Sequence, residues 1–197
     1  MPRRTTIFSR SRIVHIVNRG TGQQAIFRAE ADNAMFMRIV NEEATRLGIT
    51  IIAIVLMVNH FHLVIEPSAD NVVSTFMHNV CYRYARYFNR TYDRSGTLFE
   101  GRFKDKPVET DEYLYQVCRY VHANPVVAGL CAAPEDWPWS NFLEFIGKRN
   151  LLPHDPTLQL RYVPDIHQYR ARVLEQCQAK RILDPTLERD IWRHRME

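Results

Sequence analysis

The longest apolar stretch of the chain, residues 49–58, restricts the fold more than any other feature. It is rich in β-branched side chains and almost free of polar ones, which is typical of a strand in the middle of a sheet. A helix that crosses a bilayer needs about 20 apolar residues, so this stretch is too short to span a membrane. Asn59 then provides a turn, and residues 61–66 continue as a second strand until Pro67.

Helical and extended patterns alternate on both sides of these two strands. Apolar residues recur at helical spacing over residues 32–47 and again over 71–89, and Gly48 stands where a helix cap belongs. Residues 12–18 and 102–108 have the pattern of the first and last strands. The order β-α-β-β-α-β predicts an α+β fold of the ferredoxin-like, split βαβ kind, an antiparallel sheet with helices packed on one face.

An extra helix is expected after the last strand, over residues 111–122. Thr110 suits its N-terminal cap, and two acidic residues follow in the first turn. We expect Asn124 and Pro125 to end this helix, because the residue before a proline is pushed out of the α region.

A length of 197 residues allows one domain with an appendage. We expect residues 1–149 to form the domain and residues 150–197 to form a C-terminal extension, helical over about 168–179. The four cysteines are widely spaced and include no Cys-x-x-Cys pair, which indicates a reducing compartment and no zinc site. The first residues lack the apolar core of a signal peptide, so we expect a cytoplasmic protein with no membrane partner.

Positive charge is concentrated in one part of the chain. The formal net charge is +4 and the sequence pI is about 9.0, which permits nucleic-acid binding. Within residues 83–106, aromatic residues are interleaved with basic ones, a combination that suits single-stranded nucleic acid. The alternative is an ordinary amphipathic helix with a solvated basic face. The basic residues of this segment are Arg83, Arg86, Arg90, Arg94, Arg102, Lys104 and Lys106.

The triplet His60-Phe61-His62 is the first candidate for chemistry. Residues two apart on a strand point to the same face, so the two imidazoles project together about 7 Å apart along the strand. Two neutral imidazoles form half of a divalent-metal site, whereas the alternative is two polar residues on a wet sheet face. His15 on the first strand is either a group that supports such a site or a strand histidine with a local hydrogen bond.

Tyr120 and Asn124 are the second candidate, because a spacing of four stacks them on one helix face. A phenol has a pKa of about 10 and is a weak nucleophile at neutral pH unless something activates it or the attacked phosphate. A nearby divalent cation would activate the phosphate. The alternative is a tyrosine that packs at a helix–sheet junction.

Four ordered stretches together resemble the REP-associated tyrosine transposases, relatives of the single-tyrosine HUH transposases of small insertion sequences. The likeness covers about residues 10–145. The four stretches are MVNHFHL at 57–63, RYARYFN at 83–89, GRFK at 101–104 and RYVHANPV at 119–126.

The resemblance implies an HUH catalytic domain over residues 1–149. In it His60 and His62 would hold Mg²⁺ or Mn²⁺, with Asn124 as a third ligand. Tyr120 would attack a DNA phosphodiester, leaving a 5′-phosphotyrosine and a free 3′-hydroxyl. The implied substrate is hairpin-forming repetitive DNA, handled as single strands.

The implied contacts to the DNA backbone come from basic residues, namely Arg83, Arg86, Arg90, Arg102 and Lys104. Two positions depart from the family pattern: Val58 stands where proline is frequent, and Val127 stands where arginine is frequent. The second departure removes a DNA contact that relatives have.

Other functions stay open at this point. A replication-initiator-like nickase would use the same histidines and tyrosine. A non-catalytic DNA- or RNA-hairpin-binding module would use the same fold. A metal-dependent phosphohydrolase would need more carboxylates near the histidines than Glu66. Both a monomer and a homodimer are compatible with the sequence.

Overall fold

The computed structural model describes residues 13–69, 71–150 and 165–178. The elements follow one another along the chain as β1 (Val14–Arg19), η1 (Thr21–Gln23), α1 (Glu30–Leu47), β2 (Thr50–Leu56), β3 (His60–Glu66), α2 (Val72–Thr91), β4 (Lys104–Pro107), α3 (Asp111–Val127), η2 (Pro134–Asp136), α4 (Phe142–Phe145) and α6 (Ile166–Gln178). The predicted beginning of the first strand, at Arg12, and the predicted end of the last helix, at Ala179, lie outside the described residues.

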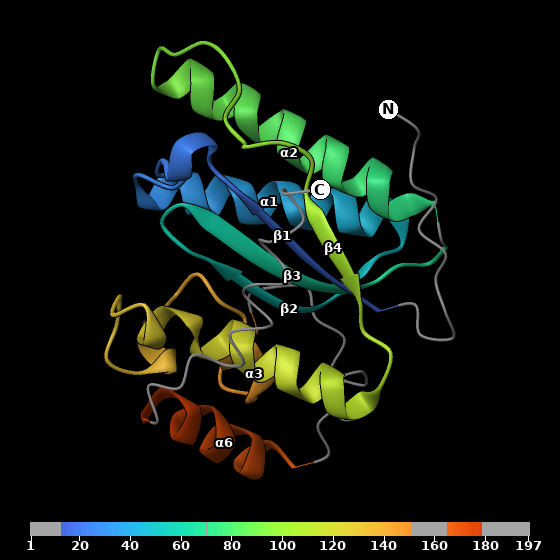
Figure 1. The fold of residues 1–197 in the computed structure, drawn as a ribbon, viewed down its shortest axis with the longest axis vertical. Helices are drawn as coiled ribbons and strands as arrows, with labels where there is room; N and C mark the ends of the chain where they lie inside the picture. The colour runs from blue at the N-terminus through green and yellow to red at the C-terminus, as the bar shows by residue number, and fades with distance from the viewer. Residues whose placement is uncertain (1–12, 70, 151–164, 179–197) are drawn as a thin grey trace, which may run out of the picture.

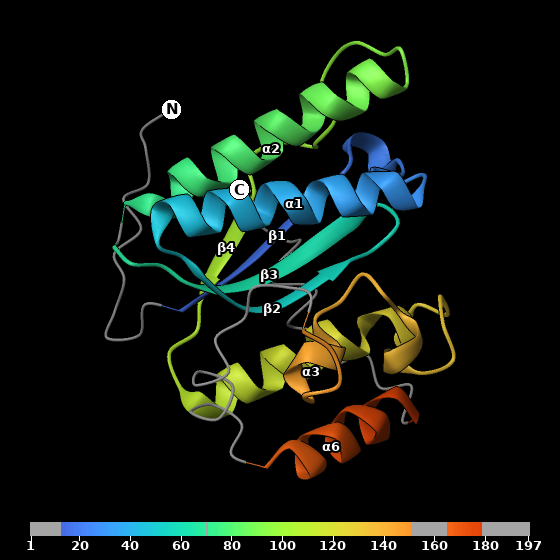
Figure 2. The same cartoon turned by 180° about the vertical axis from the view of Figure 1, so that it is seen from behind.

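The strands form one four-stranded sheet in the order β2-β3-β1-β4, and every neighbouring pair is antiparallel. Because β3 lies between β1 and β2, the first βαβ unit is split, as in a ferredoxin-like fold. Helices α1 and α2 cover one face, while α3 covers the other with α6 behind it (Figures 1 and 2). The predicted α+β, ferredoxin-like fold is thus confirmed, and the extra helix lies on the face opposite to α1 and α2.

Alternating side chains divide the core between the two faces of the sheet. Phe61 of β3 points toward α1 and α2, where its ring centroid lies 4.7 Å from that of Phe36. Val64 points toward α3 and packs with Val117 and Val121 in a second cluster. The period of two along β3 therefore places the residues beside Phe61 in the sequence, including the two histidines, on the α3 face.

Strand β2 lies at an edge of the sheet, so the prediction that it occupies the middle was wrong. Its apolar composition has a different cause: α1 and α3 cover its two faces, and the chain after α3 covers its free edge. The amide of Leu56 donates to the carbonyl of Trp139 at 2.9 Å, and the indole nitrogen of Trp137 donates to the carbonyl of Leu56 at 2.9 Å. A covered edge is protected from pairing with another chain.

Asn141 joins this covering segment to the β2 edge. Its Oδ1 accepts from the amide of Ile54 at 2.8 Å, and its Nδ2 donates to the carbonyl of Ile52 at 3.0 Å. The same Oδ1 accepts from Nε2 of His122 at 3.0 Å, and Nδ1 of His122 lies 2.6 Å from the hydroxyl of Tyr169. One buried hydrogen-bond chain therefore links β2, α3 and α6.

Helix α3 continues through Pro125 to Val127, so the prediction that Asn124 and Pro125 end it was wrong. A proline inside a helix costs about 3 kcal/mol because it lacks an N–H and crowds the preceding turn. Packing compensates here, since Ala123 and Pro125 are both buried. Beyond the proline, the amide of Leu130 donates to its carbonyl at 2.8 Å. Asn124 is consequently a residue of a continuous helix.

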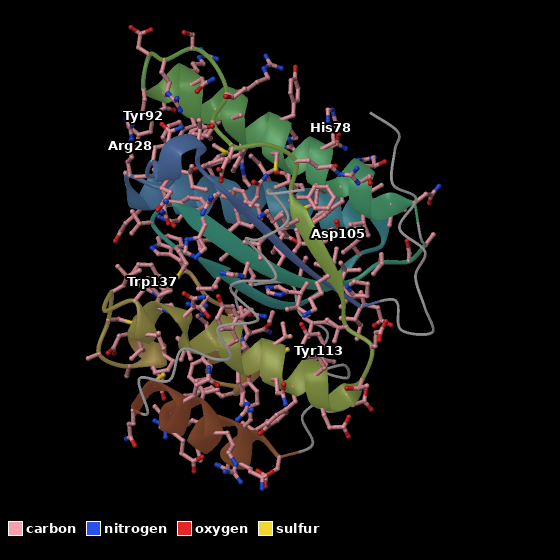
Figure 3. The ribbon with its side chains drawn as sticks, in the orientation of Figure 1. Arg28, His78, Tyr92, Asp105, Tyr113 and Trp137 are labelled. Atoms are coloured by element: carbon pink, nitrogen blue, oxygen red, sulfur yellow. The ribbon has the colours of Figure 1, made fainter. Side chains whose placement is uncertain are left out.

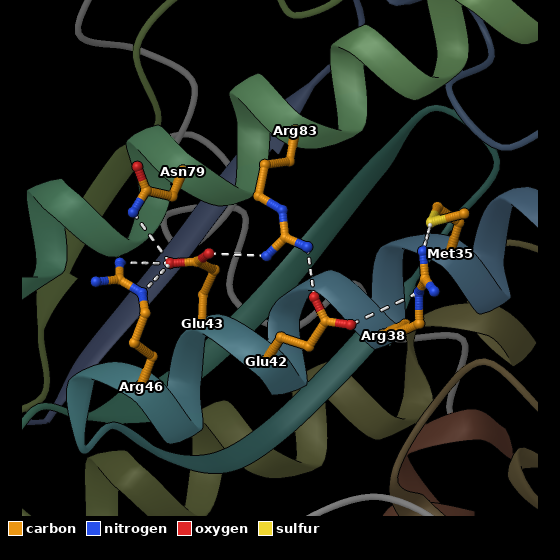
Figure 4. A network of polar contacts seen from close by, with 7 residues as sticks. All are labelled: Met35, Arg38, Glu42, Glu43, Arg46, Asn79 and Arg83. Atoms are coloured by element: carbon orange, nitrogen blue, oxygen red, sulfur yellow. Dashed lines mark hydrogen bonds and ion pairs between the residues drawn. The ribbon is translucent and has the colours of Figure 1, made fainter.

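Helices α1 and α2 are joined by an ion-pair network (Figure 4). Glu43 of α1 is buried and accepts from Arg46 at 2.6 Å, from Arg83 of α2 at 2.8 Å and from Asn79 of α2 at 3.0 Å. Arg83 also pairs with Glu42. Burial alone would raise the pKa of Glu43, but the hydrogen bonds from Arg46, Asn79 and Arg83 outweigh it and lower that pKa below its ordinary value of 4.5.

No helix among the described residues is long and apolar enough to cross a membrane.

We predict that Asn141→Ala lowers the free energy of unfolding by about 3 kcal/mol or more, because it leaves several buried donors and acceptors unpaired. Urea unfolding followed by circular dichroism measures this. The matched control is Asn71→Ala, since Asn71 is exposed and its side chain caps nothing at the start of α2. Equal unfolding midpoints for the two variants would show that Asn141 does not hold the segment in place.

We also predict that Glu43→Gln makes stability less dependent on pH. A carboxylate whose pKa is lowered in the folded state stabilises that state above its unfolded pKa, and the contribution is lost as the pH falls through the folded pKa. The urea midpoint of the wild type should therefore fall more than that of Glu43→Gln between about pH 7 and about pH 4. Glu42→Gln, which changes a half-exposed partner of the same Arg83, should keep most of the wild-type dependence.

Candidate active site

Strand β3 brings His60 and His62 to the sheet face that α3 covers. Their ring centroids are 5.1 Å apart, with the ring planes 81° from parallel. His62 is buried, whereas His60 is half-buried at the end of the strand. The two imidazoles therefore lie together on one face, as their spacing predicts.

Helix α3 brings Tyr120 and Asn124 to the same place. The ring of Tyr120 stands edge-on to that of His62, with centroids 5.2 Å apart and planes 88° from parallel. The side-chain nitrogen of Asn124 lies 3.3 Å from Nε2 of His62. Two histidines from a strand and a tyrosine and an amide from a helix thus converge, although about 60 residues separate the two pairs in the sequence.

His15 of β1 completes the cluster. Its Nε2 lies 3.1 Å from Nδ1 of His62, and the two rings are stacked with centroids 5.3 Å apart and planes 21° from parallel. Its other nitrogen, Nδ1, is buried and has no hydrogen-bond partner among the residues that the structure describes. Of the two sequence interpretations of His15, the structure supports direct contact with the histidine pair.

Burial keeps the three imidazoles neutral at physiological pH. It lowers the pKa of His62 well below its ordinary value, with further lowering from His60 and His15. Burial, then the charge of Arg19, lowers the pKa of His60 to about 4. Burial, then the charge of Lys106, lowers the pKa of His15 to about 3. A neutral imidazole has a lone pair for a metal ion or a hydrogen bond.

Arg19 and Glu100 are site neighbours that the sequence interpretation did not include. Arg19 is the strand partner of His60, and its guanidinium forms a two-point ion pair with Glu100, with Nη2 3.2 Å from Oε1. Arg19 and His15 lie four residues apart on β1, so strand alternation places them on one face. That period was a usable signal for Arg19, whereas Glu100 follows a loop and had none.

The five basic residues predicted to contact DNA do not gather in one place. Lys104 pairs with Val17, which in turn pairs with His62, so Lys104 lies in one row with His62 on the α3 face. Arg83 lies on the other side of the sheet, in the network with Glu42 and Glu43. Their predicted DNA contacts stay predictions.

The other three arginines lie on or beside α2. Arg90 is exposed in its last turn, and Arg86 lies 5.7 Å from the ring centroid of the exposed Tyr82. Arg102 donates to the Ser74 hydroxyl at 3.3 Å and lines a groove of about 1140 Å³ between α2 and residues 96–103. Figure 3 separates the two sides: His78, which also lines the groove, lies on α2, and Tyr113 lies on α3 across the sheet.

The donor set of His60, His62 and Asn124 suits a divalent cation. Imidazole nitrogen and amide oxygen are both ordinary ligands of such ions. The oxygen and nitrogen of an amide are assigned from the surrounding hydrogen bonds, and a turn of the Asn124 amide would bring its oxygen next to Nε2 of His62. Among the described residues, no three His, Cys, Asp or Glu side chains are arranged to hold a metal ion, so a metal here needs the amide.

Comparison with solved structures shows which fold this is. The structure of a REP-associated tyrosine transposase bound to a REP hairpin superimposes with a TM-score of 0.61 at 16% sequence identity, covering 78% of this chain and 89% of that one. A putative transposase from Deinococcus radiodurans R1 gives a TM-score of 0.43 at 15% identity, covering 61% of this chain and 95% of the other. A search of curated protein sequences finds no match.

Comparison with family models concerns the sequence itself. The model described as "Transposase IS200 like" matches residues 9–124. This match includes the strand with His60 and His62 and ends at Asn124, so it contains the whole cluster around His62. Because the model matches more than half of the chain, the protein belongs to the IS200-like transposase family of DNA-cleaving enzymes.

Proposed function

We propose that the protein is a single-stranded DNA endonuclease and strand transferase that uses Tyr120 as its nucleophile. The observation that carries this proposal is the placement of the Tyr120 ring against His62, with the Asn124 amide 3.3 Å from the same imidazole. A tyrosine that served only to pack would not need two histidines and an amide around it. Family membership supports DNA as the substrate.

In the proposed reaction the phenolic oxygen of Tyr120 attacks the phosphorus of a DNA phosphodiester. A bond forms between the tyrosine oxygen and phosphorus, and the bond from phosphorus to O3′ breaks. The phenol loses its proton, and the departing O3′ gains one to become a free hydroxyl. His60, His62 and Asn124 would hold a divalent cation, Mg²⁺ or Mn²⁺. Such a cation, when bound, neutralises charge on the phosphoryl oxygens.

A covalent 5′-phosphotyrosine explains transfer as well as cutting. The phosphotyrosine retains a phosphodiester bond, so a 3′-hydroxyl that attacks it can rejoin two strands and release the tyrosine. Water attacking directly would give only hydrolysis. Strand transfer therefore favours a tyrosine nucleophile over an activated water.

Hairpin-forming repetitive DNA is the substrate class we propose. The solved relative with the same fold is bound to a REP hairpin, and this chain carries basic side chains on both sides of its sheet. Lys104 shares the sheet face of His62, and Arg19 lies beside His60. Cationic groups so close to the nucleophile suit the phosphates that flank the cleaved bond.

We predict that Tyr120→Phe abolishes the covalent adduct and retains DNA binding, because only the nucleophilic oxygen is lost. End-labelled single-stranded hairpin oligonucleotides are incubated with protein and Mn²⁺, then separated on a denaturing gel. Binding is measured in parallel on a native gel.

The matched control is Tyr113→Phe, which removes a hydroxyl from the same helix two turns earlier and should leave the adduct intact. An adduct that persists in Tyr120→Phe would move the nucleophile to another tyrosine, such as Tyr113 or Tyr115. DNA binding without any adduct, across several hairpins, would indicate a non-catalytic binding module. Cleavage of sites without a hairpin would favour a replication-initiator-like nickase.

We further predict that His62→Ala abolishes Mn²⁺ binding and that Asn124→Ala weakens it, because they remove a central and a peripheral ligand. Isothermal titration of metal-free protein measures both, and EDTA should abolish the adduct formed by the wild type. The exposed His167 of α6 supplies the control variant, His167→Ala. Unchanged Mn²⁺ affinity in His62→Ala would place the metal elsewhere or remove it from the mechanism.

A further inference from the structure

We propose that His15 is a positioning residue that holds the proton of His62 on Nδ1 and so leaves Nε2 of His62 as an electron-pair donor. The proposal deepens the proposed function, because that nitrogen is the one facing Asn124. It concerns a residue of β1, on a different strand from the two histidines of β3.

The strand register places His15 within reach of His62. His15 pairs with Val64 and Val17 pairs with His62, so the two histidines are diagonal neighbours on one face of the sheet. Their rings stack with centroids 5.3 Å apart, and Nε2 of His15 lies 3.1 Å from Nδ1 of His62. Both side chains are buried, with 1% of their surface exposed, so water does not compete for this contact.

A contact of 3.1 Å between two ring nitrogens requires one proton between them. In a pair of neutral rings, that proton belongs either to His15 or to His62. If it belongs to His15, then Nδ1 of His62 accepts it and Nε2 of His62 must carry the other proton. If it belongs to His62, then Nε2 of His62 has a free lone pair.

The Asn124 amide distinguishes the two arrangements. Its nitrogen lies 3.3 Å from Nε2 of His62, and an amide nitrogen only donates. A proton on Nε2 would set two donors against each other, whereas a lone pair there accepts the amide N–H. The contacts of His62 on its two sides therefore agree on a proton at Nδ1, donated to His15.

This arrangement serves the metal site directly. An imidazole that binds a metal ion through one nitrogen donates its other N–H to a neighbouring acceptor, which sets both its tautomer and its orientation. A carboxylate or a carbonyl usually plays that part, and here a neutral imidazole does. His15 thus acts through His62 and does not touch the reacting atoms.

The test begins with the tautomer of His62 in the full-length, metal-free protein labelled with ¹⁵N-histidine. Long-range ¹H–¹⁵N correlation spectra distinguish a proton on Nδ1 from one on Nε2. We expect the Nδ1–H form in the wild type. In His15→Phe, which keeps an aromatic ring but has no acceptor, we expect that form to be lost. In His15→Gln, whose amide oxygen can accept, we expect it to return.

Mn²⁺ titration of the same proteins gives the second readout. We expect His15→Phe to bind Mn²⁺ about 10- to 100-fold more weakly than the wild type, and His15→Gln to recover most of that loss. His167→Phe makes the same substitution at an exposed histidine of α6 and should bind as the wild type does.

The Nε2–H form of His62 in the wild type would overturn the proposal, and that spectrum needs no variant to fold. Unchanged tautomer and Mn²⁺ affinity in folded His15→Phe would overturn it as well. A wild type that binds no Mn²⁺ but has the Nδ1–H form would refute the metal in the proposed function and leave the role of His15 supported.

Discussion

The antiparallel pairing of β1 with β3 is the constraint on which the rest of the structure depends. A shift of one residue would turn every side chain of β3 to the opposite face. In the observed register Phe61 enters the core beneath α1 and α2, while His60 and His62 face α3. The apolar demand of Phe61 for its core thus holds the two histidines on the side where the tyrosine lies, and the same register brings His15 to His62.

Helix α3 supplies the other half of the cluster, and its position depends on contacts far from the cluster. The buried chain of Tyr169, His122 and Asn141 ties α3 to α6 and to the backbone of β2. Because β2 also pairs with β3, the helix and the strand that meet at His62 are held to one frame. Rigid support of this kind is what a nucleophile beside a metal site requires.

Much of the fold and of the cluster could be predicted from the sequence, because each prediction depended on a local period. Alternation along β3 placed His60 and His62 together, and a spacing of four placed Tyr120 with Asn124 on one face of α3. The local rules failed where packing outweighed them. Proline should have ended α3, but burial of Pro125 keeps the helix continuous. An apolar run suggested a central strand, but β2 is an edge strand whose edge is covered by residues 137–141.

The sequence by itself determined the order of strands and helices, the two residue pairs that carry the chemistry and the family to which the chain belongs. Only the tertiary structure decided that the two pairs meet, that His15 contacts His62, and that Arg83 lies in an ion-pair network across the sheet. The physical reason is the range of each interaction. Periodicity and capping act over a few residues, whereas strand register and the burial of a helix depend on surfaces that come together only when the chain folds.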